Sequence, residues 1–301
     1  MSNHVLKIGI DGGQGFLKVC LSVQSPGKNS VDVTSVRQTY EQEVLAKQFL
    51  DSGVKKIFIL AITPHTQENS KNVAMMWSRL EINSLDPFIA TDSKLANLLV
   101  GIMFHSSCFP CSWCEAEKSA LHLLGPHRTV GNIMQNYLKF VESGENYKEA
   151  KKFENCIHPT VFSTEDKLIL GIVLPPELHL SLGVVNTVYD HMLKHNEADA
   201  LKRASLCNVK RDMTHGSPEF NGNSCRILLK KVDSLMRDSL ACLPFVEVLQ
   251  NFKLVVDACF STTLHANYKN AIQNFKESYL ALELPVTPEV HTVYLSCRRF
   301  L

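Results

Sequence analysis

Acidic, thiol and imidazole side chains gather in a few short segments of this chain. Asp11 stands between two apolar runs in KIGIDGGQGFLKVCLSV, and Asp92 follows the apolar run PFIA. Two carboxylates at neighbouring strand ends suit Mg²⁺ or Mn²⁺, which can activate a nucleophile and stabilise the leaving oxygen in phosphoryl transfer. The alternative interpretation is a turn acid at Asp11 and a helix cap at Asp92.

The thiols offer a second metal chemistry. Of the ten cysteines, only Cys108, Cys111 and Cys114 cluster, and CSWC has the C-x-x-C spacing that suits two thiolates on one tetrahedral Zn²⁺. Such a pair is half of a site, so two further ligands must come from elsewhere, and two unpaired thiols are the alternative. The histidines that flank this segment are His105, His122, His127 and His158. Scattered histidines of this kind are more typical of surface or core positions than of metal ligands.

Hydrophobic periodicity divides the elements that must position these residues into an α/β part and a helical part. The expected strands are 5–10, 16–23, 55–62 and 87–91. A helix is expected at 68–82, and Thr91 is the expected cap of the helix that follows the fourth strand. The expected later helices are 177–195, 224–240, 244–260, 265–282 and 288–300. This order places Asp11 and Asp92 side by side at one edge of a sheet.

The composition is that of a folded protein without a strong charge bias. With 301 residues, 45% of them hydrophobic, the chain can bury a substantial core, and its net charge of +1 neither supports nor excludes a nucleic-acid partner. The first residues lack the pattern of a secretory signal, and no apolar run reaches the roughly 20 residues of a membrane span. We therefore expect a nuclear or cytoplasmic protein that is not secreted, does not enter a membrane and keeps its cysteines reduced.

Several motifs occur in an order that resembles one known family. The segment TDSKLANLLVGIMFHSSCFPCSWCEAEK resembles the catalytic core of Transib-type DDE transposases, which also occurs in the vertebrate V(D)J recombinase catalytic subunit. IDGG looks like the family's first catalytic Asp-Gly turn, and LHLSLG and FNGNSCRILL are similar to two of its helical motifs. PEVHTV places His291 at the first of the family's two zinc histidines.

This resemblance implies an α/β fold, with an RNase H-like mixed sheet and a large helical, zinc-pinned insertion. It implies catalytic roles for Asp11 and Asp92, whose carboxylates should approach within about 6 Å. It also implies weakly bound Mg²⁺ or Mn²⁺, and structural zinc on Cys111, Cys114 and His291. The implied domains are an RNase H-like core with the start of the zinc segment (1–114), a connector (115–175) and a truncated helical insertion (176–301).

The chain departs from the family at two points. The family's second zinc histidine is replaced by Ser296, and the adjacent Cys297 is the better ligand, so the zinc site is either rebuilt with Cys297 or degraded. His105 or His122 completes the site only if the C-terminal helix does not dock. The family's catalytic glutamate lies beyond Leu301, where this sequence stops. We therefore expect a transposon-derived protein with no strand transfer and at most trace nicking; the nearest substitutes for the missing acid are Glu177 and Glu289.

DNA is the partner that the resemblance implies, as transposon ends in the family, and a homodimer is a further candidate assembly. The candidate phosphate contacts, for which a solvated helix face is the alternative, are Lys210, Arg211, Arg226, Lys230 and Lys231. One competing function is a DNA- or protein-binding module without catalysis. Another is an ATPase of the actin, heat-shock chaperone and sugar-kinase group. The segment IGIDGGQG also resembles the hairpin that binds phosphate in those ATPases. The second hairpin of those ATPases does not appear in residues 150–301.

Overall fold

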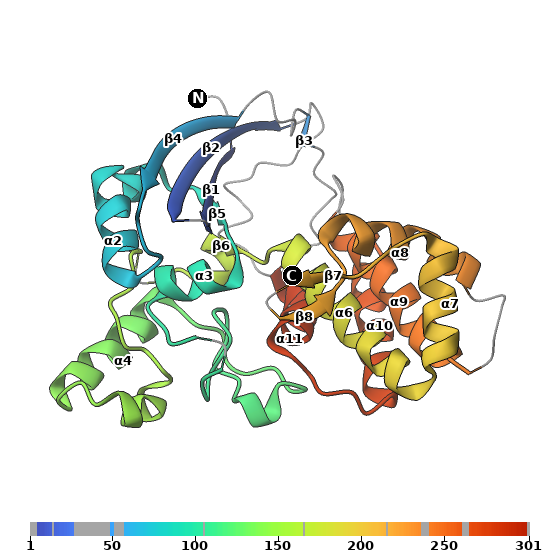
Figure 1. Cartoon of the computed structure of the whole chain (residues 1–301). Coiled ribbons are helices and arrows are strands. Elements are labelled where there is room, and N and C mark those ends of the chain that lie inside the picture. Colours follow the sequence, from blue (N-terminus) through green and yellow to red (C-terminus); the bar gives the residue numbers. More distant parts are fainter. Residues whose placement is uncertain are drawn as a thin grey trace. The chain divides into compact units, whose positions relative to one another are not determined.

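The computed structural model divides the chain into two compact units, residues 1–176 with 298–301, and residues 177–297 (Figure 1). The residues that it describes are 5–13, 15–26, 49–50, 57–104, 106–164, 166–214, 216–235, 241–260 and 265–299. Within these ranges, the side chains left undescribed are those of residues 24–26, 49–50, 214 and 296–299.

The first unit contains a mixed six-stranded sheet. Its strands are β1 (Val5–Gly13), β2 (Phe16–Pro26), β3 (Phe49–Leu50), β4 (Ile57–Pro64), β5 (Phe88–Ala90) and β6 (Val173–Leu174). Their order is β3-β2-β1-β5-β6, with β4 also paired to β2. β1 and β2, and β2 and β4, are antiparallel, whereas β5 is parallel to β1 and β6 is parallel to β5. The four expected strands therefore share one sheet, and the structure adds β3 and β6.

The alternation of side chains along β1 and β2 explains which face of the sheet is covered. Ile10 is paired with Val19, and both side chains are buried. On the opposite face Asp11 is paired with Lys18, and both are exposed. Gly15 joins the strands at φ +78°, a backbone conformation that glycine adopts without strain. Asp11 thus lies on the open face of the sheet, beside a tight turn.

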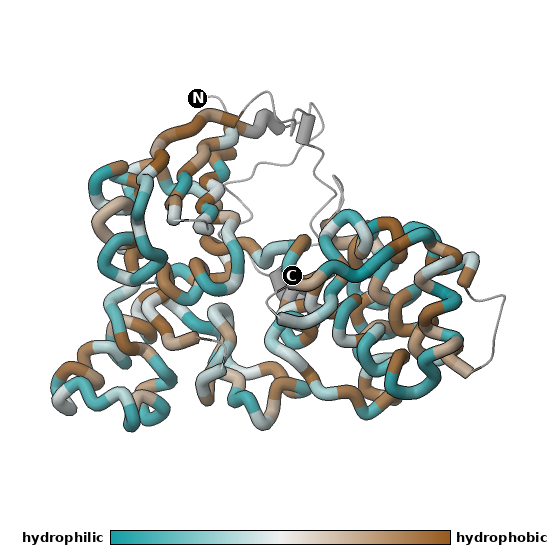
Figure 2. Tube along the Cα trace, viewed as in Figure 1, coloured by the Kyte–Doolittle hydropathy of each residue, from teal (hydrophilic) through white to brown (hydrophobic). Residues whose placement is uncertain are grey.

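Strand β4 is the exposed part of this sheet. Its apolar residues are visible in Figure 2. Phe58, Ile59 and Ile62 are each more than half exposed, and Ile57 is 44% exposed. Because β4 is paired with β2 along one side, these residues extend the sheet without contributing much to its core.

Helices cover one face of the sheet and fill the rest of the first unit. They are α2 (Ser70–Arg79), η2 (Ile82–Leu85), α3 (Ser93–Val100), η3 (Lys118–Ala120), α4 (Val130–Glu142), η4 (Tyr147–Phe153) and α5 (Ile169–Ile172). α2 packs on α3, and α3 packs on β1. Residues 115–175, expected as a connector, carry α4, η4, α5 and β6 and belong to this unit.

The second unit is helical apart from one hairpin in the part that the structure describes. Its elements are α6 (Glu177–His195), α7 (Glu197–Cys207), β7 (Asp212–Thr214), β8 (Ser217–Glu219), α8 (Gly222–Leu235), α9 (Leu243–Cys259), α10 (Tyr268–Ala281) and α11 (Pro288–Arg299). α6 contacts α7, α8 and α9, and α9 also contacts α10. Ring contacts fill the core, such as Tyr189 against Phe220 with centroids 4.7 Å apart. None of the described helices has the length and apolar composition that a membrane span requires.

Candidate functional site

Asp11 and Asp92 lie at the ends of neighbouring parallel strands, β1 and β5. Oγ1 of Thr91 donates a 2.9 Å hydrogen bond to the carbonyl oxygen of Ile10, which joins the two strand ends. Asp92 is still extended, with φ −70° and ψ 170°, so continuing the strand register places it beside Asp11. We name this pair the aspartate edge. That its two carboxylates approach to about 6 Å stays a prediction.

One carboxylate oxygen of Asp92 is used by the fold. Oδ1 of Asp92 accepts a 2.7 Å hydrogen bond from the backbone N–H of Leu95, so Asp92 is the N-cap of α3. The expectation that Thr91 caps this helix is wrong, because its hydroxyl binds β1 instead. A cation at the aspartate edge would therefore bind mainly through Asp11 and the second oxygen of Asp92.

An ion pair supports the aspartate edge from the covered face of the sheet. The Lys94 ammonium lies 2.5 Å from a carboxylate oxygen of Glu68, and Lys94 comes two residues after Asp92. The Glu68 side chain fills the space above Gly12, where a Cβ would lie 2.6 Å from its Cγ. The ion pair thus connects the start of α3 with the residue that follows Asp11.

The C-x-x-C segment is a buried loop without helix or strand. Cys111 is 2% exposed and Cys114 is 0% exposed, and a β-bridge joins Cys114 to His127. The backbone N–H of Trp113 donates to Sγ of Cys111 at 3.4 Å, and the Trp113 indole donates to the carbonyl oxygen of Val173 at 2.9 Å. These contacts orient the loop so that both thiols point to one side.

Helix α3 connects the C-x-x-C loop to the aspartate edge. The hydroxyl of Ser112, which lies between the two cysteines, donates to the amide oxygen of Asn97. Asn97 is buried in α3, whose N-cap is Asp92. The short spacing from Asp92 to CSWC in the sequence therefore has a structural reason, since one helix carries a contact to each region.

His291 is buried in the first turn of α11. It is 0% exposed, and its backbone N–H donates to the carbonyl oxygen of Thr287 at 2.9 Å. Next to it, Glu289 packs against Gly183 of α6, where a Cβ would lie 2.5 Å from Cγ of Glu289. The glycine of LHLSLG thus leaves room for the turn that carries His291.

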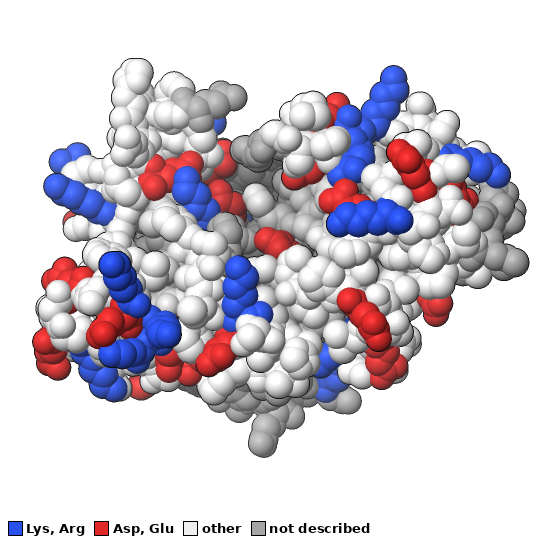
Figure 3. All heavy atoms as spheres, turned by 60° about the horizontal axis from the view of Figure 1, so that its bottom comes forward, with Lys and Arg blue, Asp and Glu red and all other residues white. Residues whose placement is uncertain are grey.

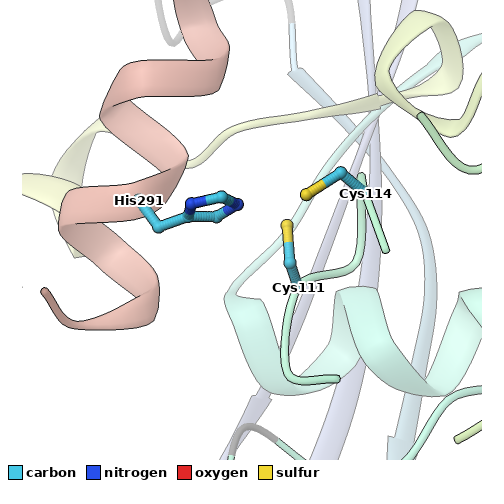
Figure 4. Close-up of side chains that lie close together, drawn as sticks. All are labelled: Cys111, Cys114 and His291. Carbon is cyan, nitrogen blue, oxygen red and sulfur yellow. The ribbon is translucent and has the colours of Figure 1, made fainter. Parts of the chain in front are cut away.

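Cys111, Cys114 and His291 form a group that could hold a metal ion (Figure 4). One ligand atom from each lies within 4.8 Å of the other two, and all three residues are buried. Figure 4 shows both sulfur atoms and the imidazole ring pointing toward one another. Burial, together with the neighbouring Cys114 thiol, raises the pKa of Cys111 well above its ordinary value. We name this group the thiolate cluster.

The other predicted zinc ligands do not add to this cluster in the part of the chain that is described. The side chains of Ser296 and Cys297 lie outside the part of the chain that the structure describes, and so does His105. His122 is exposed, and burial lowers the pKa of half-buried His158. Among described residues, no fourth histidine, cysteine or acid joins the group.

The candidate DNA contacts differ in how much of each side chain is free to meet a partner. Arg211 is mostly buried, where it donates to Asp190 at 2.6 Å and lies over the Tyr189 ring. Lys231 donates to the carbonyl oxygen of Cys207 at 3.2 Å. The candidates that are exposed are Lys210, Arg226, Lys230 and Lys231. Figure 3 shows basic and acidic side chains interspersed on the face that it draws.

The two acids expected to substitute for a third catalytic carboxylate both have helical positions. Glu177 begins α6 and lies 3.5 Å from Arg226, and Glu289 packs on Gly183 as described above. Sequence reasoning missed Glu68, which pairs with Lys94 and lies over Gly12, and Arg128, which binds the C-x-x-C loop. The signal for Glu68 was its position just before a helix, but Arg128 had none, because PHRTV looks like an ordinary loop.

Comparison of the sequence with known protein families, and with curated proteins, finds no significant match. The structure by itself defines an α/β protein with a mixed sheet, a helical second unit and a buried group of three potential metal ligands.

Proposed function

We propose that this chain is a zinc-containing protein of the Transib-type DDE recombinase class, with an RNase H-like core that acts on or binds DNA. The observation that carries this proposal is the thiolate cluster. The resemblance requires a C-x-x-C pair and a histidine far along the chain to share one metal, and Cys111, Cys114 and His291 have ligand atoms within 4.8 Å of one another.

The donor set of the thiolate cluster fits zinc better than other common metals. Two thiolates and one imidazole are ligands that Zn²⁺ prefers, whereas Mg²⁺ and Ca²⁺ require oxygen. The complete burial of all three residues is typical of a structural zinc site, in which the metal contributes free energy of folding. Zinc would supply that stabilisation here, and Cys297 stays the proposed fourth ligand.

The strand order supports the RNase H-like part of the proposal. Antiparallel strands β1, β2 and β4 are followed by α2 and then by β5, which lies parallel to β1. This order brings Asp11 and Asp92 to the same end of adjacent strands. Hard divalent cations such as Mg²⁺ or Mn²⁺ would bind there through carboxylate oxygens and water.

The aspartate edge favours weak rather than efficient catalysis. No third histidine, cysteine or acid joins Asp11 and Asp92 to form a three-membered group among the residues described. A site that stabilises both the attacking and the leaving oxygen uses two metal ions and more ligands than this pair provides. We therefore expect no strand transfer and at most trace nicking in Mn²⁺. A DNA-binding module without catalysis is the second candidate.

Metal content and a nicking assay together test the proposal. The purified chain should contain one zinc per protein, measured by elemental analysis after dialysis against metal-free buffer. Any nicking of supercoiled DNA in Mn²⁺ should disappear in Asp11→Asn and persist in the matched control Asp166→Asn, an exposed acid elsewhere in the same unit. Absence of zinc would contradict the zinc site, and nicking that survives Asp11→Asn would contradict the catalytic assignment. Zinc binding with DNA affinity but no nicking would support the binding module.

A further inference from the structure

Arg128 is a fully buried arginine that contacts the backbone of both cysteines of the C-x-x-C loop. Its side chain is 0% exposed. Its Nε donates to the carbonyl oxygens of Cys111 and Cys114, at 3.1 Å in each case. Its own backbone N–H donates to the carbonyl oxygen of Trp113 at 2.9 Å. Arg128 therefore binds three residues of CSWC from one side.

The opposite edge of the guanidinium is held by a second segment of the same unit. Nη2 donates to the carbonyl oxygen of Glu154 at 3.1 Å, and Nη1 lies 3.8 Å from the Glu154 carboxylate. Nη1 also donates to Sγ of Cys156 at 3.7 Å. Glu154 is itself oriented, since it accepts a 2.9 Å hydrogen bond from Asn136. The guanidinium thus has a fixed position and a nearby opposite charge.

The loop needs such a donor because it has no regular structure. A helix or strand satisfies its own carbonyl groups, whereas buried carbonyl oxygens in an irregular loop require donors from elsewhere. By binding the carbonyl groups of Cys111 and Cys114 with one nitrogen, Arg128 sets the separation of the two backbone segments that carry the thiols. The ligand atoms are then close together before a metal arrives, which lowers the entropic cost of binding.

We infer that Arg128 is a positioning residue of the thiolate cluster, and that it raises zinc affinity by preorganising Cys111 and Cys114. This inference rests on the zinc site proposed above and concerns residues outside the ligand set. Lysine cannot replace arginine in this role, because its ammonium is a compact point charge that does not reach the same acceptors as a planar guanidinium.

The test compares two charge-conserving substitutions at buried arginines. Arg128→Lys is the test variant, and Arg203→Lys is its matched control. Arg203 is 2% exposed in α7, where Nε donates to Asp199 at 3.1 Å. Zinc affinity is measured by competition with a chromophoric chelator, at a temperature where circular dichroism shows each protein folded. We expect a loss of about tenfold or more for Arg128→Lys, the usual effect of removing a partner outside the ligand set. Arg203→Lys should change the affinity less than about threefold.

Cobalt provides a readout that a purely structural role would not change. Co²⁺ bound to thiolates gives a charge-transfer band, which should reach its full intensity in Arg128→Lys only at a correspondingly higher metal concentration. Equal zinc and cobalt affinity in Arg128→Lys and wild type would overturn the inference while leaving the zinc site intact. A wild-type chain that binds neither metal would overturn the proposed zinc site itself, and the inference with it.

A second variant keeps the test decisive if Arg128→Lys does not fold. Glu154→Ala leaves the arginine in place but removes the carboxylate 3.8 Å from Nη1. It should lower zinc affinity in the same direction, by less than the Arg128 substitution. Wild-type affinity in a folded Glu154→Ala protein would in that case count against positioning by Arg128.

Discussion

The thiolate cluster and the aspartate edge are two regions of possible metal binding with opposite physical character. The cluster is buried and offers soft donors, and all three of its residues have their ligand atoms close together. The aspartate edge offers hard oxygen donors, with Asp11 exposed and one oxygen of Asp92 used to cap α3. A buried site with prearranged donors suits a permanently bound metal, whereas an open site with few free ligands suits a transient one.

The largest expected effect removes a ligand from the thiolate cluster. Cys114→Ser should lower zinc affinity by about a thousandfold or more, since a serine hydroxyl replaces a thiolate in a site whose total binding free energy is on the order of 10 kcal/mol. Competition with a chelator of known affinity measures the change. Cys225→Ser is the control, because Cys225 is equally buried but lies in α8 outside the cluster.

A smaller but graded effect is the dependence of zinc affinity on pH. Burial, together with the Cys114 thiol, raises the pKa of Cys111, so the metal-free protein keeps this thiol protonated at neutral pH and must release the proton when zinc binds. Apparent affinity should therefore rise with pH, about tenfold per pH unit for each proton released. Titrations at pH 6, 7 and 8 measure this slope. A flat profile would show that neither thiol carries a proton in the metal-free protein.

Much of the sheet and most of the cluster could be predicted from the sequence. His291 was predicted only from the resemblance of PEVHTV to a zinc-histidine motif. Apolar runs such as KKIFILAI mark strands directly, and Cys111, Cys114, Asp11 and Asp92 stand out because their residue types bind metals at characteristic spacings. These signals are local or depend on spacing, so a single sequence contains them.

Contacts across the fold could not be predicted in the same way. Arg128 becomes important only because residues 111–114 and 154–156 surround it, and a lone arginine in a loop gives no sign of that. Thr91 and Asp92 are both good helix caps. Asp92 is the cap here because the Thr91 hydroxyl donates its hydrogen bond to the carbonyl oxygen of Ile10. Strand β6 was missed because its two residues are too short for a period to appear.

A substitution at Gly12, which follows Asp11 in β1, sharpens the comparison because it disturbs the surroundings of the aspartate edge and leaves the thiolate cluster untouched. Gly12→Ala should lower the free energy of unfolding by about 1–3 kcal/mol, because the new methyl group would overlap the Glu68 side chain and break its ion pair with Lys94. Gly9→Ala is the matched control in the same strand. Nothing lies within 4 Å of its added Cβ, so it should be neutral or stabilising by up to about 1 kcal/mol.

Urea unfolding of both variants, with zinc present throughout, measures this difference. Zinc content should stay unchanged in each variant, since neither glycine touches the thiolate cluster. The double variant Gly12→Ala/Glu68→Ala should recover part of the loss, because removal of the Glu68 side chain makes room for the methyl group. Equal stability of the two single variants would show that the Glu68 side chain moves away at little cost.

The smallest expected effect is the stabilisation of the protein by Mn²⁺ at the aspartate edge. A ligand that binds only the folded state stabilises it by RT ln(1 + [L]/Kd), which gives about 1 kcal/mol when the free concentration is a few times a millimolar Kd. We therefore expect 5 mM Mn²⁺, roughly that excess, to raise the unfolding free energy of zinc-loaded protein by about 1 kcal/mol. Asp11→Asn should remove this increment and leave zinc binding intact, whereas Asp166→Asn should keep both. A gain of several kcal/mol would mean that the aspartate edge binds its cation as firmly as a buried site, and the contrast between the two regions would no longer hold.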